Sequence, residues 1–119
     1  MGDRMKAGKN FNIKDLPNSI NIFSVIYDVS YHLITTEVDS GKKKSLFGQV
    51  DYWDRTIRIY YKDRTIEDVF MTLLHEILHV VDDDLEMGLF EGEYREKKIN
   101  ILTTALFDTL KRNNWLKFP

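Results

Sequence analysis

The segment His75-Glu76-Ile77-Leu78-His79 combines residue types and a spacing that could bind a metal ion and carry out hydrolysis. Side chains four residues apart lie on the same face of an α-helix, so both imidazoles could bind one ion. Glu76 would then lie about 100° around the helix, beside the metal rather than on it. A zinc ion in such a site lowers the pKa of its water towards about 7, and Glu76 could act as the general base. The segment therefore predicts hydrolysis at zinc.

A third protein ligand is needed, because a catalytic zinc ion usually has three. The chain contains no cysteine, which leaves histidine, aspartate and glutamate as ligands. The metzincin continuation would need a glycine and a histidine where Asp82 and Leu85 stand, so that class is excluded. The remaining histidine, His32, belongs to a predicted strand region and would reach the site only by a coincidence of folding. An acidic residue is therefore expected to be the third ligand.

The acidic candidates come from a second predicted helix. Glu96 lies at the edge of the inward face of this helix, and we choose it as the third ligand. Glu93 lies one turn earlier and is the alternative, whereas Glu91 at the start of the helix is explained by favourable interaction with the helix dipole. Asp83 is four residues after His79, but a ligand there would crowd the same helix. We interpret the run Asp82-Asp83-Asp84 as a solvated helix end.

The first helix is predicted to run from Ile66 to about Asp83, with Thr65 as its N-cap. Its apolar residues recur at helical spacing and cover one broad side, which the two histidines do not share. The second helix is predicted from Glu91 to Arg112, followed by a short apolar tail that folds back on the body. The apolar residues of the first helix are Ile66, Val69, Phe70, Leu73, Leu74, Ile77, Val80 and Val81.

Strands are predicted before the helices. The segment from Ile20 to Tyr31 alternates apolar and polar residues and predicts one or two strands, whereas Leu46–Tyr52 and Arg55–Tyr61 predict a hairpin. The fold class is therefore α+β, with a small antiparallel sheet of three to four strands followed by two packed helices in a minimal zincin-like fold. Residues 1–12 are expected to form a flexible tail and residues 13–119 one domain. A peptide substrate could pair with an edge strand, for which Arg55–Tyr61 is the candidate.

Composition restricts the partners and the location. The net charge of −2 and the pI of about 5.9 give no general attraction to nucleic acid or to anionic membranes. No apolar stretch approaches the roughly 20 residues of a membrane-spanning helix, and the N-terminus does not have the pattern of a signal peptide. The absence of cysteine is consistent with a reducing compartment, so a cytoplasmic location is expected.

The segments Gly48–Tyr52, Thr72–His79 and Leu106–Asn114, in this order, resemble small phage- and prophage-associated metallopeptidases, which are minimal gluzincins akin to the ImmA/IrrE peptidases. The likeness spans about residues 17 to 115. It implies a compact sheet-plus-helices fold, a protein or peptide substrate, and a zinc site made of two histidines and a glutamate. In the ImmA/IrrE-like pattern the ligand glutamate is followed, at the third and fourth positions, by a small apolar residue and an asparagine. Ile99 and Asn100 occupy these positions after Glu96, although isoleucine is bulkier.

Three function classes fit these observations. The first is a zinc metallopeptidase that cleaves one or a few host or phage proteins. The second is a zinc-containing regulatory or interaction module without turnover, and the third is a metal-dependent hydrolase of a non-peptide bond. Glu76 argues against the second class, because a structural zinc site needs a fourth ligand and no general base.

Overall fold

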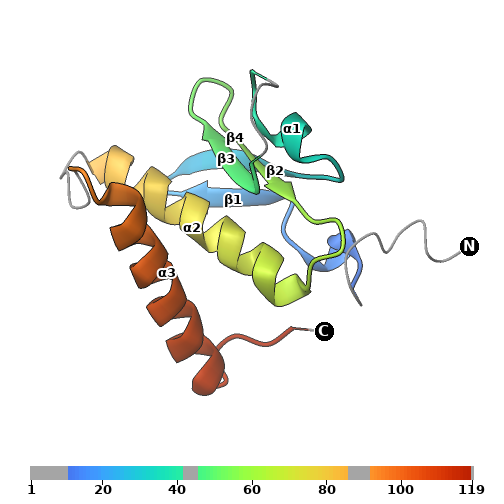
Figure 1. The fold of residues 1–119 in the computed structure, drawn as a ribbon, viewed down its shortest axis with the longest axis vertical. Helices are drawn as coiled ribbons and strands as arrows, with labels where there is room; N and C mark the ends of the chain where they lie inside the picture. The colour runs from blue at the N-terminus through green and yellow to red at the C-terminus, as the bar shows by residue number, and fades with distance from the viewer. Residues whose placement is uncertain (1–10, 42–45, 86–91, 119) are drawn as a thin grey trace, which may run out of the picture.

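The computed structural model describes residues 11–41, 46–85 and 92–118, which form a four-stranded sheet and two long helices (Figure 1). A 3-10 helix and the first hairpin precede a one-turn helix, and the second hairpin leads into the two long helices. The elements are η2 (Ile13–Asp15), β1 (Ser19–Ile22), β2 (Val25–His32), α1 (Thr35–Val38), β3 (Gly48–Asp51), β4 (Thr56–Tyr60), α2 (Ile66–Leu85) and α3 (Arg95–Arg112). The predicted α+β class, with two packed helices after the strands, is confirmed.

The sheet is mixed, whereas the sequence led us to expect an antiparallel one. Its strand order is β1-β2-β4-β3, in which β1 pairs antiparallel with β2 and β3 pairs antiparallel with β4, but β2 and β4 pair in parallel. The second hairpin was predicted from the sequence, whereas the segment from Ile20 to Tyr31 had been read as one or two strands and contains parts of two, β1 and β2. The direction of the central pair depends on the connection between the hairpins, which is long enough for a crossover. Alternating side chains do not carry that information.

The sheet topology also changes the candidate for substrate pairing. We expected Arg55–Tyr61 to be an edge strand, but β4 lies between β2 and β3, so neighbouring strands use both of its edges. Of the two edge strands, β3 packs more extensively on α2. A peptide that extends the sheet on this side would therefore pair with β3.

The hydrophobic core lies between the sheet and α2. Val69, Leu73 and Val80 on the apolar side of α2 pack in the same buried cluster as Ile57 and Ile59 from β4. This is the side of α2 that the sequence periodicity predicted to be buried. The histidines are thereby left to face the region between the sheet edge and α3.

The N-terminal boundary of the folded body lies earlier than predicted. Phe11 is only 3% exposed and belongs to the hydrophobic core, and Asn12 caps η2 with its side chain. Both residues had been assigned to the tail 1–12, the rest of which lies outside the described residues. A single large apolar residue next to a polar segment gives little periodicity, so the sequence did not reveal this anchor.

Helix α2 begins at Ile66 as predicted, and α3 ends at Arg112 as predicted, but α3 begins at Arg95 after a turn at residues 92–94 rather than at Glu91. The hydroxyl of Thr65 accepts the backbone N–H of Asp68 at 3.1 Å, which is the predicted N-cap interaction of α2. Helix α3 packs on α2 through Phe70 and Phe107, and Phe118 from the C-terminal segment contacts both rings. The predicted return of the apolar tail is thus confirmed for Phe118. No helix in the described part of the chain has the length and apolarity needed to cross a membrane.

Candidate metal centre

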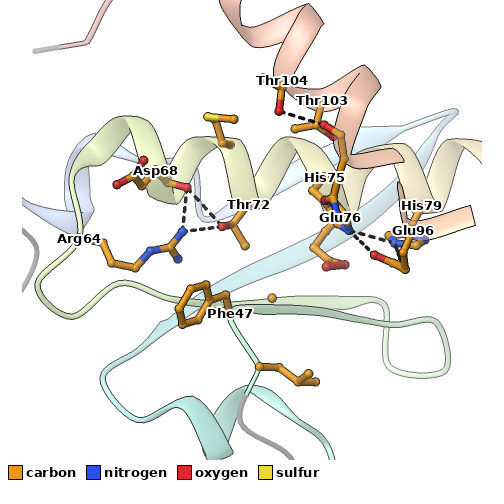
Figure 2. A pocket seen from close by; sticks show the side chains of 14 residues that line it. Phe47, Arg64, Asp68, Thr72, His75, Glu76, His79, Glu96, Thr103 and Thr104 are labelled. Carbon is orange, nitrogen blue, oxygen red and sulfur yellow. Dashed lines mark hydrogen bonds and ion pairs between the residues drawn. The ribbon is translucent and has the colours of Figure 1, made fainter. Parts of the chain in front are cut away.

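Three side chains from two helices converge at one point. The Nε2 atoms of His75 and His79 on α2 are 3.2 Å apart. Glu96 in the first turn of α3 places one carboxylate oxygen 3.1 Å from His75 Nε2 and the other 2.7 Å from His79 Nε2 (Figure 2). The structure therefore brings together the three residues that the sequence suggested as ligands.

The donor set of these three residues fits a divalent metal ion. With bond lengths of about 2.0–2.1 Å, ligand atoms in a tetrahedral zinc site stand roughly 3.3 Å from one another. The separations of 3.2 Å between the two imidazoles and 3.1 Å from His75 to Glu96 are close to that value, and the 2.7 Å from His79 to the other carboxylate oxygen is shorter. One ligand atom from each of the three residues lies within 4.8 Å of the others. Burial lowers the pKa of His79, which favours the neutral imidazole that binds metals. Three protein ligands would leave one position of a tetrahedral ion for water or substrate.

Glu76 lies beside this group without joining it. Its side chain extends towards the sheet edge at Gly48 (Figure 2), and the residue is only 7% exposed. Burial, together with the charge of Glu96, raises the pKa of Glu76 to about 7. A carboxyl group that titrates near neutral pH can both accept and return a proton there, as acid–base catalysis requires.

The raised pKa of Glu76 predicts that the free energy of unfolding of the metal-free protein depends on pH. Because the folded protein holds this proton up to about pH 7 and the unfolded chain releases it near 4.5, stability falls as the pH rises between these values. We expect Glu76→Gln to raise the metal-free free energy of unfolding by about 3 kcal/mol at pH 8 and by less than about 1 kcal/mol at pH 5. Urea unfolding with a chelator at both pH values measures this. An equal effect at the two pH values, or a similar effect of the exposed control Glu93→Gln, would contradict the prediction.

Ion pairs connect the start of α3 to α2 next to Glu96. The guanidinium of Arg95 lies 2.8 Å from a carboxylate oxygen of Asp83 and 3.4 Å from one of Asp82. Asp82 is only 3% exposed, so the interpretation of this run as a solvated helix end is wrong for that residue. Asp83 also pairs with Arg95, and it does not belong to the metal-binding group found among the described residues. Because Glu96 directly follows Arg95, these ion pairs fix the start of α3 where its carboxylate meets the histidines.

Loss of this attachment should weaken metal binding without removing a ligand. We expect Arg95→Ala to lower zinc affinity by about 10- to 100-fold, the usual effect of losing a group that orients a metal ligand. Competition with a fluorescent chelator measures the dissociation constant. Arg112→Ala is the control, since Arg112 is exposed and pairs with Asp108 within α3. Equal affinities of the two variants would show that Arg95 does not position Glu96.

The site opens into a cleft with a volume of about 800 Å³. Helix α2 forms its floor, residues of α3 form one wall, and residues 46–48, which include the first residue of β3 and the two before it, form the other. A Cβ atom on Gly48 would lie 2.7 Å from Cγ2 of Thr72 and 3.2 Å from both Cγ and Oε1 of Glu76. The absence of a side chain at Gly48 therefore lets the sheet edge lie directly over the general-base candidate.

Substitution of Gly48 should disturb both the fold and the cleft. A Cβ atom at 2.7 Å must displace Thr72 or β3, so we expect Gly48→Ala to reduce stability by about 1–3 kcal/mol, as overpacking does. Chemical unfolding measures the effect. Gly41→Ala is the matched control, because its nearest neighbours, the carboxylate oxygens of Asp39, would be at 3.7 and 3.9 Å. An equal loss of stability in both variants would exclude the close approach as the cause.

The other sequence candidates lie elsewhere. His32 is 2.8 Å from the hydroxyl of Ser30 and 3.7 Å from a carboxylate oxygen of Glu37, and it does not belong to the metal-binding group found among the described residues. Glu93 is exposed and is also outside that group. Glu91 lies outside the described residues. Two lining residues, Gly48 and Arg64, were missed, because only the tertiary approach of β3 and the β4–α2 loop brings them to the cleft.

In comparisons with known proteins, no family model, no curated protein and no solved structure matches this chain.

Proposed function

We propose that this chain is a zinc-dependent metallopeptidase of the gluzincin type, with His75, His79 and Glu96 as metal ligands and Glu76 as the general base. One observation carries the proposal. A buried carboxyl group with a pKa of about 7 lies in an open cleft beside two imidazoles and a carboxylate whose donor atoms converge. A structural metal site would have no use for such a base next to an open coordination position.

The chemistry divides between the ion and the protein. A zinc ion held by the three ligands would polarise the scissile carbonyl and acidify the attacking water. Glu76 accepts the proton of that water and then donates it to the leaving amine. The raised pKa of Glu76 suits both steps near neutral pH.

The sheet edge supplies the means of binding the substrate. A peptide in an extended conformation can lie in the cleft along residues 46–48, because β3 is an edge strand and offers backbone groups for pairing. Backbone pairing is independent of side chains, so it suits a protein or peptide substrate. We place this activity in the cytoplasm, where a chain without cysteine has no disulfides to lose.

A proteome-derived peptide library tests the proposed activity. Zinc-loaded wild-type protein should create new peptide termini, and the chelated protein and Glu76→Gln should not. Termini that also appear with Glu76→Gln would indicate a contaminating protease. If the wild type binds zinc stoichiometrically and cleaves no peptide, the proposal is wrong and the regulatory or interaction module becomes the better explanation.

A further inference from the structure

Arg64 is a cationic residue in the wall of the same cleft, and neutral groups hold it in place. Its guanidinium donates hydrogen bonds to the backbone carbonyl of Tyr60 at 2.6 Å. It also donates to the backbone carbonyl of Asp68 at 2.9 Å and to the hydroxyl of Thr72 at 2.6 Å (Figure 2). These bonds use three of the five N–H groups of an arginine. Two N–H groups therefore have no acceptor among the described residues and could bind another one.

The charge of Arg64 has no ion-pair partner within the described residues. Asp68 is the acidic residue that influences it most, but the side chain of Asp68 is exposed and only its backbone carbonyl accepts a hydrogen bond. Phe47 covers one face of the guanidinium at 4.7 Å from the ring centroid. Arg64 is partly buried, so water solvates its charge incompletely, and this burial lowers its pKa. An anion that entered the cleft would compensate the positive charge of Arg64.

The guanidinium lies within reach of a peptide bound at the metal centre. Thr72, which it contacts, precedes His75 and Glu76 by about one turn of α2, or roughly 5 Å along the helix axis. An extended peptide advances about 3.3 Å per residue. A substrate group at Arg64 would thus belong to a residue one to three positions from the scissile bond.

We propose that Arg64 forms an anion subsite of the cleft and selects substrates with a carboxylate one to three residues from the scissile bond. The inference rests on the proposed peptidase function and adds a substrate class to it. The carboxylate can come from an aspartate or glutamate side chain or from the C-terminus of the substrate. Arginine binds either of them through charge-assisted hydrogen bonds.

Cleavage profiling of peptide libraries distinguishes the two sources. One library carries free C-termini and the other amidated C-termini, and each is cut by wild type, Arg64→Gln and Arg64→Lys. Arg112→Gln is the matched control, because it removes an exposed arginine that does not line the cleft. For the best peptide, kcat and KM are then compared between a glutamate and a glutamine at the selected position.

An acidic side chain as the source gives an enrichment of Asp or Glu at one position in both libraries. A C-terminal carboxylate gives cleavage at a fixed distance from the end, in the free library alone. We expect Arg64→Gln to abolish the preference and to lower kcat/KM about 10- to 100-fold, mainly through KM. Arg64→Lys should retain part of the preference, and Arg112→Gln all of it.

Cleavage by the wild type with neither preference, or a preference that Arg64→Gln keeps, overturns this inference and leaves the peptidase proposal intact. If Arg64→Gln fails to fold, Arg64→Lys decides, because a preference that Arg64→Lys keeps in full also overturns the inference. Failure of the wild type to cleave any peptide overturns the proposed function itself.

Discussion

Glu76→Gln is expected to reduce peptide cleavage by about 10²–10⁴-fold while zinc binding remains intact. The substitution keeps the shape of the side chain but removes the group that accepts a proton from water and returns it to the leaving amine. Glu76 is outside the group of converging donors, so metal content should stay at the wild-type level. Steady-state kinetics on one cleaved peptide, with metal analysis of the same sample, measure both quantities. The loss should fall on kcat, because the proton transfer belongs to the transition state.

Glu93→Gln provides the control for this experiment. It makes the same chemical change at an exposed glutamate next to α3 and outside the converging group. Its activity and metal content should match those of the wild type. Undiminished cleavage by Glu76→Gln would remove Glu76 from the mechanism. Zinc loss in this variant would instead identify Glu76 as a ligand.

The helix that carries the histidines was predictable because the local sequence indicates which face is buried and where the helix begins. Apolar side chains recur with the helical period, Thr65 caps the N-terminus, and the histidines fall on the remaining face. The position of Glu96 followed from the same reasoning about an inward face. Helical periodicity favoured Glu96 over Glu93 without excluding Glu93, which the structure places in the turn before α3 rather than in the helix.

The parts of the site that were missed depend on approaches between elements. Gly48 matters because β3 lies against α2, and Arg64 matters because the loop before α2 turns into the cleft. Neither residue has a periodic pattern or a motif around it. The pairing of Arg95 with Asp82 likewise requires the crossing of α2 and α3, which local sequence does not encode.

Zinc should stabilise the wild-type protein strongly, and Glu96 should be needed for this effect. An ion that binds only the folded state adds about 2.7 kcal/mol at a free concentration of 100 times its dissociation constant. For a chain of this size that corresponds to a rise in Tm of roughly 10 °C. Differential scanning calorimetry with zinc and with a chelator measures the rise. His75→Ala should show almost none of it, because one imidazole and one carboxylate hold zinc much more weakly than three ligands do.

The pair Glu96→Gln and Glu93→Gln separates the two candidates for the third ligand. Both variants remove one negative charge at or just before the start of α3, so changes in helix-dipole interaction are similar. The carboxylate of Glu96 lies 3.1 and 2.7 Å from the two histidine nitrogens, so Glu96→Gln should lose most of the zinc-dependent rise in Tm. Glu93→Gln should keep it. The opposite result would assign the ligand to Glu93, and a full rise in both variants would show that zinc does not need a carboxylate from this segment.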